Sequence, residues 1–306
     1  MKKWIIYALV LALVVLPFAA CGSEGKKDDG TLQFAYMVRE MDNPYWSDVI
    51  EGMESVLGDR GAIEVFDSAS ESATEQQNLF NVISGDYDGI FYTSADYSGS
   101  VEVMQSLIDI GVPVVVIESS SVSTELGDAH ILGNSDEAGA DTALILADKI
   151  GGAGKIAVID VQQYGLQGCM QVFDQYPEIE IVDHISLGGS DYEAAKNAAQ
   201  NWLRDYPDLA GVWTSNGLVS QGVLEVVAAH GIPVAEARDG GMTVYMSDGA
   251  LLCTTVDMGT DYGIAAMQTM DQLLQGQSLA DPVILVGKVV VTPENLEEYR
   301  EHLMAG

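Results

Sequence analysis

Short apolar segments alternate with amphipathic segments from residue 31 to the end of the chain. The apolar segments cover residues 32–38, 63–66, 89–94, 113–119, 155–160, 179–186, 209–216, 251–257 and 282–292. Segments with helical spacing lie between most of them, at 44–57, 74–84, 98–110, 136–150, 192–206, 218–230 and 262–274. Apolar strands that alternate with helices are typical of parallel sheets covered on both faces. About ten strands would be many for one open sheet, so the pattern predicts an α/β chain with two sheets in two lobes.

An internal repeat supports the division into two lobes. Residues 89–94 (GIFYTS) are followed by a helical segment and by Gly-Val-Pro-Val at 111–114. Residues 211–216 (GVWTSN) are followed by a helical segment and by Gly-Ile-Pro-Val at 231–234. Each unit reads as a strand, a helix, a turn and a second strand, although any two strand–helix units share some likeness.

Polar residues end the strands of both repeat units. They are Ser94, Glu118, Asn216 and Asp239. Open α/β sheets bind ligands at the carboxyl ends of their strands. If the two lobes face each other, these residues converge on one cleft and are candidates for ligand binding.

Composition excludes several classes of function. The formal net charge is −33, from 46 acidic and 13 basic residues, and such a surface repels nucleic acids and anionic membranes unless a lipid anchors it. The four His are scattered without metal-ligand spacing, so we expect no metal and no cofactor. Cys169 and Cys253 have no CxxC spacing, and the sequence leaves open whether they pair or stay as buried thiols.

The first residues predict export. Lys2 and Lys3 precede an apolar run at 4–18, which is shorter than the ~20 residues of a spanning helix. The small residues before Cys21 resemble the lipobox of bacterial lipoproteins, in which the Cys carries the lipid. We therefore expect a signal peptide at 1–20, then a lipidated Cys21 and a flexible tether to residue 30; the alternative is an ordinary signal peptide with a chance Cys.

Four motifs together resemble one known family. They are Asn-Pro-Tyr-Trp at 43–46, the strand at 111–118 that ends in an acid, Trp-Thr-Ser-Asn at 213–216, and Ser-Asp-Gly-Ala-Leu at 247–251 followed by Thr-Thr-Val-Asp at 254–257. In this order and spacing, the chain is similar over nearly all of residues 31–292 to a sugar-type periplasmic binding protein of the ribose/galactose class. That class is the solute receptor of ABC importers.

The resemblance implies the type I periplasmic-binding-protein fold, two Rossmann-like lobes joined by hinge strands. It implies an N-terminal lobe of residues 31–133 plus 258–286 and a C-terminal lobe of residues 134–257 plus 287–306. The hinge crossings would lie near 133–134, 257–258 and 286–288. Ligand contacts to both lobes would then favour a closed form that docks on a permease.

The resemblance also implies roles for single residues. Asn43, Tyr45 and Trp46 would form the wall of the N-terminal lobe, and Glu118 would accept ligand hydroxyls. Ligand contacts from the C-terminal lobe would come from Asn216 and Asp239, while Asp257 would lie near a hinge crossing. The residues themselves allow a plainer interpretation, in which Asn43 only caps a helix and the two aromatic residues belong to the core. Because adjacent aromatic residues at a helix start cannot both face one core, we expect at least one to face the cleft.

One departure from the family concerns the ligand. The Arg that usually follows the first strand of the C-terminal lobe is missing from residues 164–171, and Ser119 stands where another Arg is usual after Glu118. The expected cleft therefore holds Glu118, Asp239 and Asp257 without a guanidinium. Unpaired carboxylates are costly in a closing cleft. We therefore expect a polyhydroxyl or amine-bearing ligand in preference to an anionic one.

The sequence therefore predicts a lipid-anchored, extracytoplasmic and monomeric receptor for a sugar-like ligand, with ABC permease subunits as partners. A receptor that feeds a sensor kinase or chemoreceptor, or one that binds a nucleoside or an autoinducer, remains open. No GxSxG or HExxH motif supports an enzyme. A sugar-responsive repressor would need a DNA-binding helix pair where this chain has its apolar leader.

Overall fold

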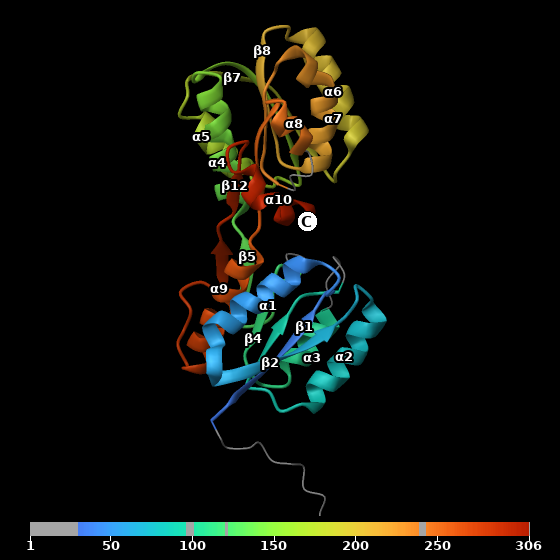
Figure 1. The fold of residues 1–306 in the computed structure, drawn as a ribbon, viewed down its shortest axis with the longest axis vertical. Coiled ribbons are helices and arrows are strands. Elements are labelled where there is room, and N and C mark those ends of the chain that lie inside the picture. The colour runs from blue at the N-terminus through green and yellow to red at the C-terminus, as the bar shows by residue number, and fades with distance from the viewer. Residues whose placement is uncertain (1–29, 96–100, 120–121, 239–242, 306) are drawn as a thin grey trace, which may run out of the picture.

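The computed structural model describes residues 30–95, 101–119, 122–238 and 243–305. The predicted signal peptide, Cys21 and Asp239 lie outside these residues. Within them, no helix has both the length and the apolar character needed to cross a membrane. The prediction of two α/β lobes is confirmed, because the chain forms two six-stranded sheets in two lobes, one above the other in Figure 1.

The N-terminal lobe is built on an entirely parallel sheet of order β11-β5-β4-β3-β1-β2. Its strands are β1 (Leu32–Val38), β2 (Gly61–Asp67), β3 (Gly89–Tyr92), β4 (Val114–Ile117), β5 (Ala129–Gly133) and β11 (Val283–Val286). Its helices are α1 (Pro44–Leu57), α2 (Ser72–Ser84), α3 (Val101–Ile108) and α9 (Gly259–Leu274), with a 3₁₀ turn η1 (Gly58–Arg60).

The C-terminal lobe repeats this plan, with sheet order β12-β10-β9-β8-β6-β7 and β12 antiparallel to β10. Its strands are β6 (Ala153–Val161), β7 (Glu178–Leu187), β8 (Leu209–Thr214), β9 (Val234–Glu236), β10 (Leu251–Val256) and β12 (Val289–Val291). Its helices are α4 (Ser135–Lys149), α5 (Leu166–Phe173), α6 (Tyr192–Asp205), α7 (Gly217–Val227), α8 (Thr243–Ser247) and α10 (Leu296–Ala305), with a 3₁₀ turn η2 (Ala228–His230).

Helices cover both faces of each sheet, which explains why the central strands are apolar throughout. In β1, Phe34 and Tyr36 pack into one core with α1 and α9, while Ala35 and Met37 pack into another with α2 and α3. The two free thiols, Cys169 and Cys253, share one core of the C-terminal lobe and are both buried.

Glycine allows α1 and α9 to lie backbone to backbone. A Cβ built on Gly263 of α9 would lie 1.9 Å from the carbonyl oxygen of Val49 in α1. The equivalent contact of the C-terminal lobe joins α4 to the loop before α5, where a Cβ on Gly139 would also lie 1.9 Å from the carbonyl oxygen of Gly165. Each lobe therefore has a closely packed helical layer next to the connection between the lobes.

The chain passes between the lobes three times. It crosses from β5 to α4, returns from β10 to α9, and crosses again from β11 to β12. The segment 282–292, which the sequence pattern presents as one apolar run, is thus two strands in different sheets with Gly287 and Lys288 between them. All three crossings meet at the carboxyl edges of the parallel strands, so the polar residues that end those strands lie near the connection.

Candidate functional site

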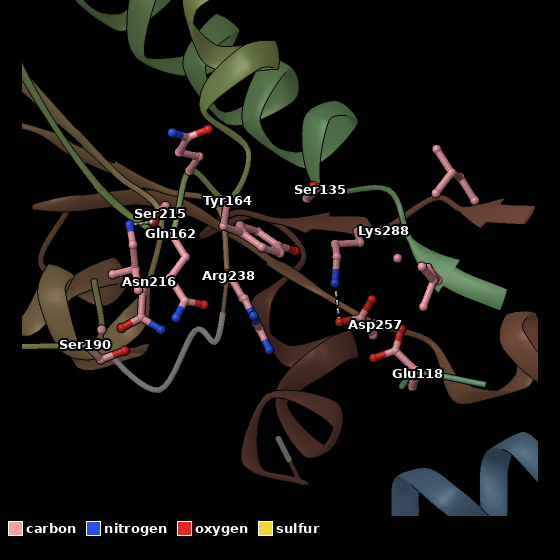
Figure 2. Close-up of a pocket in the computed structure, with 16 residues that line it drawn as sticks. Glu118, Ser135, Gln162, Tyr164, Ser190, Ser215, Asn216, Arg238, Asp257 and Lys288 are labelled. Carbon is pink, nitrogen blue, oxygen red and sulfur yellow. Dashed lines mark hydrogen bonds and ion pairs between the residues drawn. The ribbon is translucent and has the colours of Figure 1, made fainter. Parts of the chain in front are cut away.

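A cavity of about 700 Å³ lies between the lobes, beside the three crossings. This volume is within the range of about 300–1,000 Å³ that is usual for small-molecule sites. Figure 2 shows residues that line it. They are Glu118 of the N-terminal lobe; Leu132, Gly133, Ser135, Asp257, Leu285 and Lys288 at the crossings; and Val161, Gln162, Gln163, Tyr164, Gly189, Ser190, Ser215, Asn216 and Arg238 of the C-terminal lobe.

An ion pair joins two of the crossings at the edge of the cavity. Asp257 follows β10, Lys288 follows β11, and the Lys288 ammonium donates to the Asp257 carboxylate (Figure 2). The hydroxyl of Tyr262 donates to the same carboxylate. The Lys288 side chain is only 5% exposed, and burial alone would lower its pKa, but the adjoining Asp257 raises the pKa above the ordinary value. This contact holds the second and third crossings together.

Glu118 enters the cavity from the carboxyl end of β4 with an unusual backbone. Its φ is +48°, a left-handed conformation that costs about 1–2 kcal/mol for a residue with a Cβ. Burial and the neighbouring Asp257 raise the pKa of Glu118, while the positive charges of Lys288 and Arg238 act in the opposite direction. Strained residues of this kind cluster at ligand sites. Glu118 is thus a partly buried acceptor that a donor from a ligand would stabilise.

Tyr164 and Arg238 form the wall of the cavity on the C-terminal lobe. The Arg238 guanidinium lies over the Tyr164 ring, with Cζ 4.9 Å from the ring centroid, and Lys288 Nζ lies 5.9 Å from the same centroid. The expectation of a cleft without a guanidinium is therefore wrong. Among the described lining residues, the carboxylates Glu118 and Asp257 are matched by the cations Arg238 and Lys288.

Asn216 has two roles at the end of β8. Its side-chain oxygen caps α7 by accepting from the backbone N–H groups of Leu218 and Val219, at 3.1 and 3.4 Å, and the residue also lines the cavity. The neighbouring Ser215 accepts from the backbone N–H of Val161 at 2.7 Å, which links the end of β8 to the end of β6. Asn216 is therefore fixed in place before any ligand arrives.

Four other predicted site residues do not line this cavity. Asn43 caps α1 and accepts from the backbone N–H of Tyr45 at 2.9 Å. Trp46 is 4% exposed and belongs to the core of the N-terminal lobe, and Tyr45 packs edge-on against its ring. Ser94 is 1% exposed, and its backbone N–H donates to Ser119. The cavity thus brings together three of the predicted residues, namely Glu118, Asn216 and Asp257.

Sequence reasoning missed several lining residues. Tyr164, Gln162 and Gln163 lie in the loop after β6, and Arg238 and Lys288 lie beside positions that were already considered. The sequence did contain a signal for Arg238 and Lys288. Arg238 directly precedes the candidate Asp239, and Lys288 lies in an expected crossing between the lobes. Within the described ranges, no cluster of three or more His, Cys, Asp or Glu is arranged to hold a metal ion.

Comparisons with known proteins agree on one kind of protein. A family model described as "Periplasmic binding protein domain" matches residues 34–278. A ribose import binding protein from Bacillus subtilis (strain 168) is 25% identical, over 97% of this chain and 99% of its own. A xylitol-binding protein from Mycolicibacterium smegmatis is 22% identical, over 95% and 86% of the two chains. Both relatives are binding proteins and not enzymes.

Solved structures share the fold. An arabinose-binding protein from Geobacillus stearothermophilus superposes with a TM-score of 0.71 at 20% identity, over 88% of this chain and 99% of its own. A periplasmic ribose ABC transporter protein from Conexibacter woesei superposes with a TM-score of 0.69 at 19% identity, over 90% and 95% of the two chains. The architecture of two lobes is thus common to all three.

Proposed function

Because the chain belongs to the periplasmic binding protein domain family, we propose that it is an extracytoplasmic solute receptor. It binds a small polyhydroxyl ligand, a sugar or sugar alcohol, between its lobes and delivers it to an ABC importer permease. The observation that carries this proposal is the polar cavity at the three crossings, to which both lobes contribute side chains.

The lining favours a neutral ligand with many hydroxyl groups. The amide of Gln162 can donate and accept, as a hydroxyl does, and Ser190 adds a further hydroxyl. The two carboxylates are matched by two cations among the described residues, so a ligand need not supply a charge. This differs from the sequence-based preference that included an amine-bearing ligand, because that preference assumed a cleft without cations.

Closure of the lobes supplies the mechanism. Glu118 reaches the cavity from the N-terminal lobe, whereas Gln162, Asn216 and Arg238 reach it from the C-terminal lobe. A ligand that contacts both sets gains more contacts when the lobes approach, so binding shifts the population toward the closed form. A permease that recognises the closed form would then distinguish the loaded receptor from the empty one.

Thermal unfolding of the purified protein with a panel of compounds tests this function. The panel holds D-ribose, D-allose, xylitol and myo-inositol as neutral polyols, with D-ribose 5-phosphate and D-glucosamine as charged comparisons. A ligand at ~100 times its Kd stabilises by ~2.7 kcal/mol, which raises Tm by several degrees. We expect a neutral polyol to give the largest rise; a rise with only the charged compounds contradicts the proposed ligand class.

A pair of variants separates specific binding from a general solvent effect. Gln162→Ala removes an amide at the cavity, whereas Gln175→Ala removes an exposed amide that donates to Gln171 in the same lobe, outside the cavity lining. We expect Gln162→Ala to reduce the ligand-induced rise in Tm and Gln175→Ala to leave it unchanged. Equal effects of the two variants contradict binding in this cavity.

We also propose that a lipid on Cys21 anchors the receptor to the outer face of the cell membrane. The lipobox-like residues before Cys21 support this anchor. Cys21→Ala should release the protein from the membrane fraction and abolish labelling by an alkyne-tagged fatty acid. Membrane retention of the Cys21→Ala protein contradicts the anchor.

A further inference from the structure

The loop at residues 161–164 has a backbone conformation that residues with side chains rarely adopt. Gln162 and Gln163 both have positive φ, at +52° and +63°. Such left-handed conformations persist in non-glycine residues only where surrounding contacts hold them. The whole loop lines the cavity, and Figure 2 shows Gln162 and Tyr164 projecting from it.

A buried carboxylate directly before this loop supplies such contacts. Asp160 ends the buried part of β6, and its side chain has no exposed surface. Its Oδ1 accepts from the backbone N–H of Gln163 at 2.6 Å and from the Ser186 hydroxyl at 2.9 Å, and its Oδ2 accepts from His184 Nε2 at 2.8 Å. A buried carboxylate is costly unless hydrogen bonds satisfy it, and here donors engage both oxygens.

The three donors come from two directions. His184 and Ser186 are two residues apart on β7, so both side chains lie on the same face of the sheet and orient the Asp160 carboxylate. The N–H of Gln163 is the donor within the loop itself. The Asp160 carboxylate is therefore held by β7 on one side, and on the other side it holds Gln163, a left-handed residue of the cavity wall.

We propose that Asp160 is a positioning residue for ligand binding, held in turn by His184 and Ser186. It fixes the 161–164 loop in the left-handed form that presents Gln162 and Tyr164 to the ligand. This inference deepens the proposed function and rests on it for the ligand, but the effect on the loop can be measured without any ligand.

Hydrogen exchange of the ligand-free protein tests the first half. In Asp160→Ala, we expect the amides of residues 162–164 to exchange at least tenfold faster than in the unmodified protein, with no change in β1 or β3. Asp183→Ala is the matched control, because Asp183 lies on the neighbouring strand β7 and accepts from the indole of Trp202 at 2.7 Å, away from the 161–164 loop. This control should lower Tm without faster exchange at residues 162–164. Unchanged exchange of Gln163 in Asp160→Ala overturns the proposal.

Conservative and disruptive changes at His184 keep the test decisive if Asp160→Ala fails to fold. His184→Gln retains an N–H donor that can reach the carboxylate, whereas His184→Leu does not. We expect His184→Leu to accelerate exchange at residues 162–164 and His184→Gln to restore slow exchange. Equal exchange in the two variants overturns the role of this hydrogen bond.

Titration calorimetry tests the second half, with D-ribose and xylitol as the probes. We expect Asp160→Ala to raise the Kd of the probe that binds the unmodified protein by at least tenfold, and Asp183→Ala to leave that Kd unchanged. Faster loop exchange with an unchanged Kd overturns the positioning role. If neither probe nor the other neutral polyols bind the unmodified protein, the proposed function fails, while the exchange experiment still decides whether Asp160 holds the loop.

Discussion

Replacing Lys288 with Met breaks the ion pair that joins the second and third crossings. Met keeps most of the length of the Lys stem, so the change removes the charge and leaves the packing nearly intact. Lys288 is 5% exposed and Asp257 is 26% exposed, so the loss leaves a largely buried carboxylate with the Tyr262 hydroxyl but without its cation. We therefore expect the variant to be less stable than the unmodified protein.

The expected loss of stability follows from the burial of the two partners. Removing one partner of a fully buried pair costs ~3–5 kcal/mol. Because Asp257 keeps some exposure to water and one donor, the cost should fall to about 2 kcal/mol. Because the entropy of unfolding is ~2.1 cal/mol/K per residue, a loss of this size lowers Tm by about 3 °C in a chain of this length.

Urea denaturation followed by far-ultraviolet circular dichroism measures the loss. Lys155→Met is the control, because Lys155 pairs with Asp208 at 2.9 Å on the surface, with side-chain exposures of 34% and 63%. That variant should unfold at the same urea concentration as the unmodified protein. The double variant Lys288→Met/Asp257→Asn should recover part of the loss, because Asn leaves no uncompensated charge.

Two results would refute this reasoning. One is a Lys288→Met protein as stable as the unmodified protein, which would mean that solvent already screens the pair. The other is a double variant no more stable than Lys288→Met, which would mean that the lost packing of the Lys stem, and not the stranded charge of Asp257, causes the effect.

Three further predictions concern single positions. Glu118→Gln should raise Tm near neutral pH, because burial and Asp257 raise the pKa of Glu118 and disfavour its charged form. This gain in Tm should shrink as the pH falls, because the carboxyl of the unmodified protein then takes up its proton. A gain in Tm that grows in acid contradicts this reasoning. Gly263→Ala should lower stability by about 1–2 kcal/mol in a thermal melt, because overpacking against Val49 outweighs the better helix propensity of Ala; a stabilised variant is the contrary result. Cys169 and Cys253 should react with Ellman's reagent only after unfolding, since burial raises the pKa of both thiols; rapid reaction of the native protein refutes it.

The fold was predictable where both faces of a strand are buried. Strands such as β3 and β4 are apolar at every position because helices cover the sheet on both sides, and such runs are visible in the sequence. Strand β5 was missed because its short run contains His130, which is fully buried and bonds through Nε2 to the carbonyl of Leu126. Helix α10 was missed because, among those of its residues whose burial is described, only Leu296 and Leu303 are buried.

The site was predictable only where a strand end fixes the position of a residue. Glu118 directly follows β4 and Asn216 comes two residues after β8, so their place at the carboxyl edge could be inferred, although their roles remain predictions. Arg238 and Tyr164 lie in loops, where the direction of a side chain depends on contacts that the sequence pattern does not encode. Trp46 was expected to form part of the cleft wall, but the helix that begins at Pro44 directs its ring into the core.

Neither lobe is a continuous piece of chain, and this determines the order in which the molecule can assemble. The edge strand β11 pairs with β5 in the sheet of the N-terminal lobe, with Val283 beside His130, although most of the C-terminal lobe lies between them in sequence. Helix α9, which packs on α1, also comes from beyond residue 258. During synthesis, the N-terminal lobe therefore cannot be completed until nearly the whole chain has been made. Contacts between residues so far apart in sequence also form slowly. The N-terminal half should remain open to chaperones and proteases until the last strands arrive.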